Sequence, residues 1–479
     1  MKLVREISAG LTVGLVALPL ALAFGIAGGA TAAAGLYTAI VAGLVSGLCG
    51  GSKYQISGPT GAMSVILVGV VAKYGISGML AAGLLAGVLQ ILMGLLGLGK
   101  LVKLIPNPVI TGFTNGIAIV IVLGQLKYIT TAPFLTVLVA ATILLVRRVN
   151  KTIPASLFGL AVGIGANLLF GWNGPTVQAI EPALPKFGWP NLALADLVPL
   201  FEPALAIALL GTIESLLSAA VADSMTGTVH NSNRELVGQG LGNIAAALVG
   251  GVPSTGAIAR TAVNIQNGGS TRLVHVVHSL FLLAVLLFLG PWTAFIPLAA
   301  LSGILVVTSY DMFDFQTVTI LRKSSTHDAV ILLATMVLTV CTNLVVAVGA
   351  GIVLAALIQC YHSKTLRILP LNANGNGNIQ IFSLQGALHF GTVVSLNKAL
   401  RQVKPGGIVI LDLSGLTMLD QTGVIALSKL QQSTGQTPAA RIILCGLHPE
   451  YQSLVEAAGG IPTDQIIRDL AQTLALAEG

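Results

Sequence analysis

The chain has 479 residues, of which 54% are hydrophobic and only 9% charged, and its mean hydropathy is +0.90. Soluble domains carry about 25% charged residues, so the composition excludes a soluble globular protein and predicts a polytopic membrane protein. The net charge of +7 does not indicate a nucleic-acid partner, because the basic residues form no soluble patch.

Apolar segments near 20 residues long recur from Ala9 to about Gln359. Each is long enough to cross a bilayer core of roughly 30 Å. They predict fourteen spans: 8–27, 32–49, 57–72, 77–97, 106–125, 132–148, 154–171, 198–222, 235–252, 259–289, 291–300, 301–310, 326–342 and 344–360. The first span is no cleavable signal peptide, because no small-residue cleavage site ends it.

Basic residues are distributed unequally between alternate loops. With a cytoplasmic N-terminus, the inner loops hold thirteen lysines and arginines, and the outer loops hold only Lys73, Lys127 and Lys186. This asymmetry follows the positive-inside rule. It predicts a multi-pass protein of the inner or plasma membrane with both termini in the cytoplasm. Four cysteines without paired spacing (Cys49, Cys341, Cys360 and Cys445) predict neither a disulfide framework nor a zinc site.

A short motif interrupts the apolar chain twice. Residues 59–62 (Pro-Thr-Gly-Ala) return as residues 253–257 (Pro-Ser-Thr-Gly-Ala), and a Gly-Gly pair precedes each copy. The threonines Thr60 and Thr255 are 195 positions apart. Glycine-broken segments at matching places in two halves predict a transporter built from an inverted repeat, with its substrate bound where the breaks meet.

Each break is followed by a resumption of helix. A helix that begins in mid-membrane directs its free N–H groups and positive dipole end at the break, so two such ends facing one another predict an anion site. Gly61 and Gly256 would let the ligand approach the backbone. The alternative is that both are ordinary turn glycines, which the repetition makes less favourable.

Glu214 is the outstanding polar residue, because it lies in mid-span among apolar neighbours. A carboxylate there is costly and is expected to face a cavity, a cation or a proton path. The 195-residue offset places it opposite Pro19, where we expect a break in the first span. Ser218, one turn from Glu214 on the same face, could supply a second oxygen to a cation. Phe24 is by default a packing or lipid-facing phenylalanine, and it is of interest only because a break at Pro19 would turn it towards the site.

Arg260 closes the second motif. Near a mid-membrane helix start, an arginine either attracts the anion or pairs with Glu214. Thr261 either touches the ligand or caps the helix, and capping is the favoured interpretation.

Other polar groups carry no predicted chemistry. Residues 94–100 resemble a phosphate loop, but Leu101 holds the Ser/Thr place and the segment is read as a helix end. His275 and His278 lack a third ligand, so we expect packing or hydrogen bonding rather than metal binding. Four residues of an inner loop are predicted to be solvated or to cap the next helix: Asp223, His230, Asn233 and Glu235.

The composition changes near Pro370, where a polar, glycine-rich linker (370–378) begins. Beyond it, strand and helix patterns alternate: strands at 407–413 and 440–445, helices at 424–432 and 449–458. The chain is therefore divided into a transmembrane domain (1–369), the linker and a small cytoplasmic α/β domain (379–479).

Five stretches together resemble the SulP family of anion transporters over almost the whole chain: 18–19 with 35–37, 57–61, 211–217, 231–240 and 255–264. The resemblance implies an all-α membrane domain of fourteen spans in a 7+7 inverted repeat with two half-helices, a core domain that moves against a gate domain, and a homodimer. It implies an anion site between the third and tenth helices, near the first and eighth. Members carry sulfate, bicarbonate, chloride or dicarboxylates.

The resemblance and the motifs together give the candidate site. The predicted anion-binding residues are Thr60, Gly61, Ala62, Gly256, Ala257, Arg260, Thr261 and Phe24, and the predicted coupling-ion residues are Glu214, Ser218 and Gly256. Sodium-coupled bicarbonate members have aspartate and threonine in place of Glu214 and Ser218, and an acid in place of Gly58. Residues 21–27 and 264–269 are nevertheless similar to those members, while glutamate is common in proton-coupled sulfate and dicarboxylate members. The coupling ion is therefore open.

The C-terminal domain resembles the STAS domain at residues 408–414 and 419–423. Related regulatory domains have a phosphorylated serine where this chain has Gln421, so no phosphoswitch is expected there. Thr422 is read as a helix-start hydroxyl.

The sequence thus predicts secondary active transport of a small inorganic anion, sulfate or bicarbonate, by proton or sodium symport. No cofactor is expected other than bound Na⁺ or H⁺ as the coupling ion. The alternatives are an uncoupled exchanger or channel, a dicarboxylate transporter and, in another class, a membrane-anchored STAS regulatory protein. An enzyme is not expected, because no nucleophile–base pair or metal cluster is evident.

Overall fold

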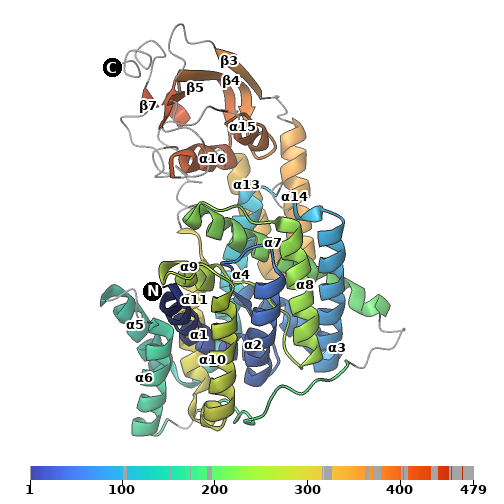
Figure 1. The fold of residues 1–479 in the computed structure, drawn as a ribbon, viewed down its shortest axis with the longest axis vertical. Helices are drawn as coiled ribbons and strands as arrows, with labels where there is room; N and C mark the ends of the chain where they lie inside the picture. The colour runs from blue at the N-terminus through green and yellow to red at the C-terminus, as the bar shows by residue number, and fades with distance from the viewer. Residues whose placement is uncertain are drawn as a thin grey trace. The chain divides into compact units, whose positions relative to one another are not determined.

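A computed structural model of the protein describes residues 2–100, 105–149, 154–172, 174–190, 197–315, 317, 326–342, 344–361, 366–371, 379–400, 403, 408–432, 441–451, 455 and 466–467. The chain forms two compact units (Figure 1). Unit 1 comprises Met1–Val102 and Ile117–Phe313, and unit 2 comprises Lys103–Gly116 and Asp314–Gly479.

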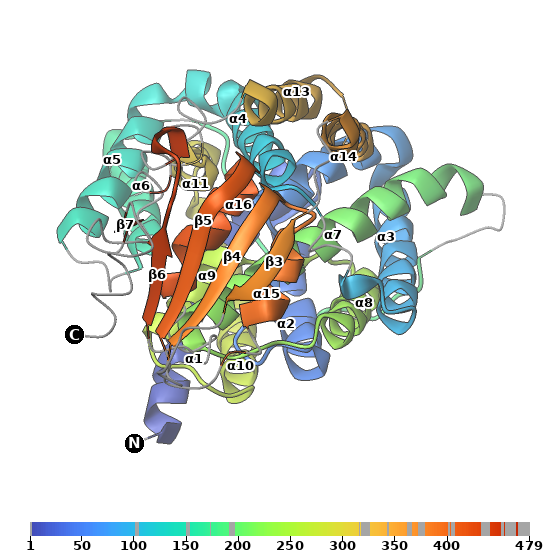
Figure 2. The same cartoon turned by 90° about the horizontal axis from the view of Figure 1, so that it is seen from above.

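Unit 1 is helical. Its elements are α1 (Lys2–Ala27), α2 (Ala32–Cys49), β1 (Ser57–Gly58), α3 (Gly61–Leu95), the second half of α4 (Asn107–Thr131), α5 (Pro133–Val149), α6 (Ala155–Phe170), α7 (Leu197–Thr226), α8 (Ser232–Leu248), β2 (Thr255–Gly256), α9 (Ile258–Gln266), α10 (Leu273–Leu289), the 3-10 helix η3 (Gly290–Phe295) and α11 (Leu298–Met312). Figures 1 and 2 both show α5 and α6 side by side, away from the pair α3 and α8.

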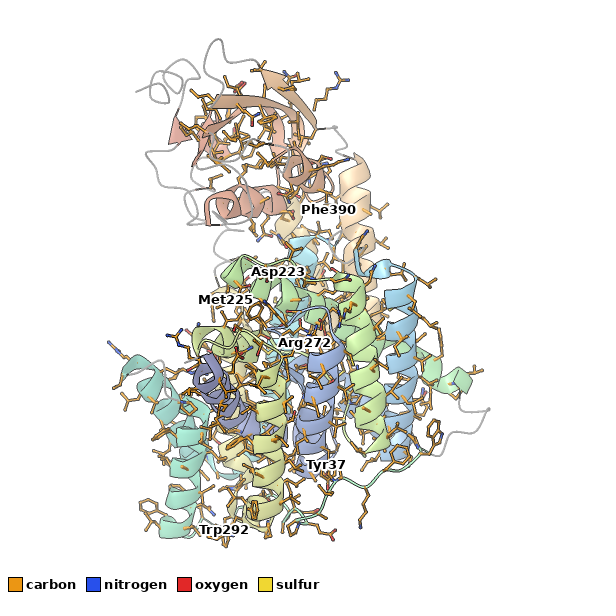
Figure 3. The ribbon with its side chains drawn as sticks, in the orientation of Figure 1. Tyr37, Asp223, Met225, Arg272, Trp292 and Phe390 are labelled. Carbon is orange, nitrogen blue, oxygen red and sulfur yellow. The ribbon has the colours of Figure 1, made fainter. Side chains whose placement is uncertain are left out.

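Six helical segments of the described residues are long and apolar enough to cross a membrane: Leu3–Ala27, Ala32–Cys49, Gly61–Leu95, Asn107–Thr131, Val198–Thr226 and Leu273–Phe295. Four further apolar helices are shorter: Ala155–Phe170, Leu298–Met312, His327–Cys341 and Val346–Ile358. The polytopic membrane fold is confirmed, and the division into fourteen spans stays a prediction. Exposed Trp292 and half-buried Tyr37 lie towards one end of unit 1, with Arg272 nearer the other (Figure 3).

Several predicted boundaries are wrong. The predicted span 259–289 is two helices, α9 and α10, separated by a turn in which Gly268 has a φ of +83°. The two spans predicted between 291 and 310 are instead η3 followed by one helix, α11. Leu289, before η3, and Ile296, after it, have non-helical backbone angles, so the chain turns there rather than in the middle of α11.

Helix α3 contains the two spans predicted at 57–72 and 77–97. Its 35 residues would extend about 52 Å if straight, more than one membrane thickness. Gly75 interrupts it with φ +69° and ψ −176°. The break therefore lies between the two predicted spans, as the sequence indicated.

Helix α1 does not break at Pro19. The proline lies inside a helix that continues to Ala27, so the expected break in the first span is wrong. Proline removes one backbone hydrogen bond, but neighbouring helices can stabilise such a site in a membrane protein.

Glycines allow the helices around the two breaks to pack closely. Gly87 of α3 and Gly240 of α8 face one another, and a Cβ on either would lie within 2.6 Å of the other's carbonyl oxygen. Such close approach is typical of helix contacts in membranes. The α3–α8 pair, with α7 and α2 alongside, therefore forms a closely packed support for the segments between them.

Unit 2 contains α13 (Thr326–Cys341), α14 (Leu344–Tyr361) and a five-stranded sheet. The sheet order is β3 (Arg367–Leu371), β4 (Ile379–Leu388), β5 (Ile408–Leu419), β6 (Arg441–Cys445) and β7 (Ile466–Ile467), with α15 (Val393–Leu400) and α16 (Gln421–Gln432) packed on it (Figure 2). Strand β3 pairs antiparallel with β4, and the other pairs are parallel. The α/β character of this domain is confirmed.

The predicted linker overlaps the sheet. Pro370 and Leu371 belong to β3 and pair with Phe382 and Ile381 of β4, so the sheet begins before the linker predicted at 370–378. The apolar run Ile368–Leu371 supplies the side chains for an edge strand, where proline is tolerated. Residues 372–378 lie outside the described residues, as does most of the helix predicted at 449–458.

Candidate functional site

The two breaks meet. Strands β1 and β2 are antiparallel, with Ser57 opposite Gly256 and Gly58 opposite Thr255. The Ala257 N–H also donates to the Ile56 carbonyl at 2.8 Å. Segments about 200 residues apart in the chain thus form one short ladder inside the helical unit. The starts of helices α3 and α9 follow directly from its ends.

Thr60 ends the first break and is the N-cap of α3. Its extended backbone and side chain let Oγ1 accept a hydrogen bond from the Met63 N–H at 3.3 Å. The same hydroxyl donates to Glu214 Oε2 at 2.9 Å. The N–H groups of Gly61 and Ala62 belong to the first helical turn, which has no intrahelical acceptor. The described residues offer them no other acceptor, so this turn presents donors for an anion.

Helix α7 joins the two breaks through two successive residues. Glu214 bonds Thr60 of the first break and also interacts with the Thr255 side chain of the second. Ser215 reaches only the second break: its Oγ accepts from the Gly256 N–H at 2.9 Å and lies 3.1 Å from Thr255 Oγ1. Glu214 is partly exposed, whereas Ser215 is fully buried. Glu214 is therefore less deeply enclosed than Ser215, and the serine is part of its support. Ser215 was not among the site residues predicted from the sequence.

The second break leaves fewer donors than expected. The Gly256 N–H is bound by Ser215, and the Ala257 N–H is bound by Ile56. The N-cap of α9 is Ala257, which makes no side-chain capping bond. Among the described residues, three first-turn N–H groups of α9 have no acceptor: those of Ile258 and Ala259, which are both exposed, and that of Arg260, which is the predicted site residue among them.

The side chains of Ser218 and Thr261 are hydrogen-bonded to each other. Their hydroxyls are 3.1 Å apart, both side chains are fully buried, and Thr261 Oγ1 accepts from the Ile56 N–H at 3.0 Å. Thr261 is the fourth residue of α9, so it does not cap that helix, contrary to the favoured interpretation. The structure thus places both residues behind β1, as support for the ladder. Their predicted ligand roles stay predictions.

Arg260 is 1% exposed and braces the first break. Its Nη2 donates to the Pro59 carbonyl, and a Cβ on Gly58 would lie 2.4 Å from its Nη1. The ion pairs found among the described residues do not include one with Glu214. Its charge acts on the junction from behind the backbone, because the guanidinium is enclosed there.

Phe24 of α1 packs beside the first residue of α3, Gly61, even though α1 is not broken at Pro19. A Cβ on Gly61 would meet Phe24 Cε1 at 3.1 Å and Ile121 Cδ1, from α4, at 2.6 Å. Both side chains are 4% exposed. Ile121 was missed because an isoleucine in an apolar span gives no sequence signal.

Gly256 fits a different environment from Gly61. A Cβ there would lie 2.0 Å from Gln55 Nε2 and 3.1 Å from Ser215 Cα. Gln55 is 2% exposed, so buried protein atoms surround Gly256 and leave no space there for a ligand to approach its backbone.

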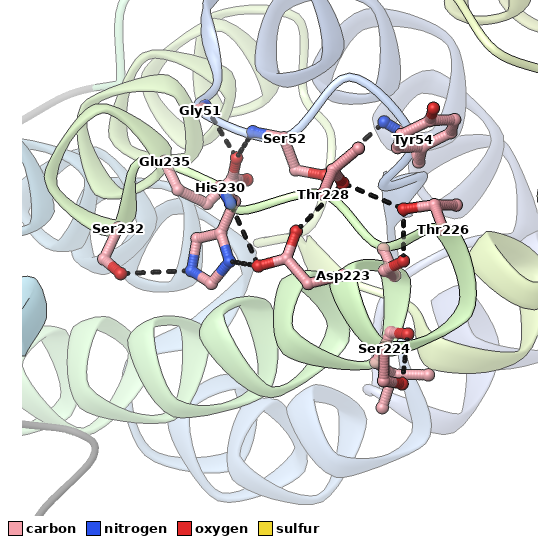
Figure 4. Close-up of polar contacts among 12 residues, drawn as sticks. Gly51, Ser52, Tyr54, Asp223, Ser224, Thr226, Thr228, His230, Ser232 and Glu235 are labelled. Carbon is pink, nitrogen blue, oxygen red and sulfur yellow. Dashed lines mark hydrogen bonds and ion pairs between the residues drawn. The ribbon is translucent and has the colours of Figure 1, made fainter. Parts of the chain in front are cut away.

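The inner-loop residues form a hydrogen-bonded cluster rather than a solvated surface (Figure 4). Asp223 Oδ2 lies 2.7 Å from His230 Nδ1, and His230 Nε2 lies 3.0 Å from Ser232 Oγ. This order is also that of a hydrolase triad, which the sequence analysis did not anticipate. All three residues come from the α7–α8 turn and its ends, and the Asp223 carboxylate also accepts from the His230 N–H. The contacts therefore close the turn.

Glu235 was predicted to be solvated or capping, and it is neither. It is 1% exposed, and its Oε2 accepts from the N–H groups of Gly51 and Ser52, both at 2.8 Å. Gln239 donates to Glu235 Oε1 at 2.8 Å and to Ser57 Oγ at 2.6 Å. Glu235 is thus connected through Gln239 to strand β1.

The described residues contain no group of three or more His, Cys, Asp or Glu that could hold a metal ion. His275 and His278 are both buried.

In unit 2, Gln421 and the Thr422 hydroxyl are buried at the start of α16.

Comparison with known proteins identifies this arrangement. Residues 3–152 and 130–335 match the model of the sulfate permease family. The chain belongs to this family. Residues 370–473 match the STAS domain, so the α/β sheet of unit 2 is a STAS domain, as predicted.

Relatives span nearly the whole chain. The putative sulfate transporter YvdB of Bacillus subtilis is 36% identical, over 96% of this chain and 94% of that protein. The bicarbonate transporter BicA of Synechocystis is 33% identical, over 92% and 87%.

Solved structures share the fold. The transmembrane domain of a cyanobacterial BicA aligns with a TM-score of 0.67 at 34% identity, covering 73% of this chain and 97% of that one. The murine Solute Carrier 26 family member A9 anion transporter in its inward-facing state aligns with a TM-score of 0.69 over 99% of this chain and 91% of that one. At 16% identity the latter shows the fold alone.

Proposed function

We propose that this sulfate permease family member is a secondary active transporter of a small oxyanion, sulfate or bicarbonate. The observation that carries the proposal is the ladder of β1 and β2, which brings the first turns of α3 and α9 together beside the carboxylate of Glu214. Backbone N–H groups at helix N-termini bind oxyanions without a fixed cation. The names of the relatives YvdB and BicA give the two candidate anions.

Glu214 gives the reason for coupling. An oxyanion and an ionised carboxylate at one junction repel one another strongly in a low-dielectric site. A cation bound at Glu214 removes that repulsion, so anion and cation bind together. Transport of both in one cycle then follows.

We further propose that the coupling cation is a proton. Sodium requires several oxygen ligands, and the hydroxyls near Glu214 are already engaged: Ser218 with Thr261, and Ser215 with the Gly256 N–H. A proton requires only the carboxylate oxygen. The proton-coupled members that share a glutamate at this position agree with this assignment.

We also propose that both termini lie in the cytoplasm and that the protein is a homodimer.

Purified protein in liposomes tests the function. We expect labelled sulfate or bicarbonate to accumulate when a proton gradient is imposed and not when a sodium gradient is imposed at constant pH. Glu214→Gln should abolish accumulation yet retain exchange of labelled for unlabelled anion, because glutamine keeps the hydrogen bond to Thr60 but cannot titrate. Glu202→Gln, on the exposed start of the same helix, is the matched control. Full accumulation by Glu214→Gln would remove Glu214 from the coupling step.

The result also separates the alternatives. Flux that needs neither gradient would indicate an exchanger or channel. A dicarboxylate transporter would accumulate dicarboxylates but not the two proposed anions. Absence of any anion flux in folded protein would favour a regulatory protein acting through its STAS domain.

A further inference from the structure

The donor-bearing first turn of α3 is flanked by two apolar side chains. A Cβ on Gly61 would lie 2.6 Å from Ile121 Cδ1 and 3.1 Å from Phe24 Cε1. Both side chains are nearly fully buried. An oxyanion that approaches Gly61 from the side where a Cβ would lie meets these two side chains, and a charged ligand loses its hydration beside apolar atoms without gaining new partners there.

The two side chains belong to helices with different surroundings. Phe24 is on α1, which packs against α2, α9 and α10 within unit 1. Ile121 is on α4, a continuous helix whose residues belong partly to unit 2 and partly to unit 1. In unit 2, Gly112 and Gly116 of α4 lie against Leu332 and Thr339 of α13. Ile121 presents to Gly61 the free end of a flexible side chain, whereas Phe24 presents a rigid ring, so Ile121 is the cover that can be displaced.

We propose that Ile121 is the gating residue of the anion site, and that its δ-methyl group restricts which anions reach the start of α3. The nature of the anion rests on the proposed function, whereas the restriction itself rests on the contact of Ile121 with Gly61. Shortening the side chain should open the approach, and larger oxyanions should gain more than smaller ones. Phe24 would remain in place as the fixed wall.

The test uses Ile121→Val, which removes the one carbon atom that approaches Gly61 and is mild enough to preserve folding. Ile117→Val is the matched control: the same residue type, the same helix, one turn away and equally buried. The reporter is Thr60→Cys, because Thr60 is partly exposed and precedes Gly61. Modification of the introduced thiol by a small charged thiosulfonate is followed by mass spectrometry of its peptide in full-length protein.

We expect Ile121→Val to accelerate modification about fourfold, the equivalent of one buried methyl group, and Ile117→Val to leave the rate unchanged. Equal rates in the Ile121→Val variant and its parent would overturn the proposal, as would the same acceleration by Ile117→Val. In liposomes containing protein without the reporter, Ile121→Val should also raise the ratio of molybdate to sulfate uptake. If the parent carries no anion at all, the proposed function fails while the modification rates still decide the role of Ile121.

Discussion

The two breaks are alike in sequence but differ in their surroundings. At the first, a threonine hydroxyl caps α3 and contacts Glu214, and two N–H groups find no acceptor in the part of the chain that the structure describes. At the second, the backbone of Gly256 and Ala257 is already bonded to Ser215 and Ile56, and α9 has no side-chain cap. The repeated motif therefore makes one half that offers donors and one half that holds the ladder together.

This asymmetry has a physical origin in α7. One helix supplies consecutive residues to the two breaks, and consecutive residues on a helix point about 100° apart. Glu214 thus faces the junction, while Ser215 faces the buried ladder. A symmetric site would need a carboxylate at both breaks, which would double the electrostatic cost of the apo state.

The two glycines provide the strongest test of the difference. Gly256→Ala should destabilise the protein by about 3 kcal/mol, because the new Cβ would overlap buried Gln55 and press on the backbone of Ser215. Gly61→Ala should fold nearly normally, because the atom nearest to its Cβ is the movable end of Ile121. Its anion affinity should nevertheless fall about tenfold, equivalent to 1.4 kcal/mol.

Thermal unfolding in detergent and calorimetric anion titration would measure both effects. Gly69→Ala is the control, because it lies in α3 and a Cβ there meets nothing within 4 Å. If Gly256→Ala were as stable as Gly69→Ala and lost only binding, the second break would be a ligand-facing half like the first.

Arg260 is expected to have an intermediate effect. Arg260→Lys keeps the charge but should lose the hydrogen bond to Pro59, leaving a buried carbonyl unpaired at a cost of about 1–3 kcal/mol. We expect Arg260→Lys and Arg260→Met to weaken anion binding equally, since the brace sets the position of Thr60. Arg234→Lys, at an exposed arginine that also bonds a carbonyl, is the control. Normal binding in the lysine variant alone would show that the charge, not the brace, matters.

Much of this organisation was readable from the sequence. Hydropathy, the glycine-broken repeat and the isolated Glu214 predicted the membrane fold, the meeting of the breaks and the residue at their junction. These signals are visible because each departs from an apolar background. Ser215 and Ile121 gave no such signal: a serine beside a carboxylate and an isoleucine in a span are unremarkable until the helices are packed.

The errors have a common cause as well. Pro19 predicted a break, and Thr261 a cap, from local propensity, but tertiary packing decided both. Glu235 was expected to be solvated or to cap the next helix because its loop is polar. Instead, its carboxylate is buried and accepts hydrogen bonds from two backbone N–H groups of another loop. Which polar residues face a ligand and which satisfy buried backbone depends on contacts between segments about 200 residues apart, and local pattern does not contain them.

The smallest expected effect is at Ser218, where sequence and structure give opposite predictions. The sequence placed its hydroxyl beside Glu214 as a second cation ligand, whereas in the structure the hydroxyl bonds Thr261. Ser218→Ala should therefore cost only about 1 kcal/mol of stability, one net hydrogen bond, because Thr261 keeps its bond from the Ile56 N–H. Cation-driven accumulation should be unchanged. Ser215→Ala is the informative companion, since it leaves the Gly256 N–H without its acceptor and should weaken anion binding by displacing the ladder. Both variants would be compared by thermal unfolding and by accumulation in liposomes under a proton and then a sodium gradient. If Ser218→Ala folds normally but loses accumulation, the hydroxyl does serve the coupling ion, and sodium becomes the better candidate.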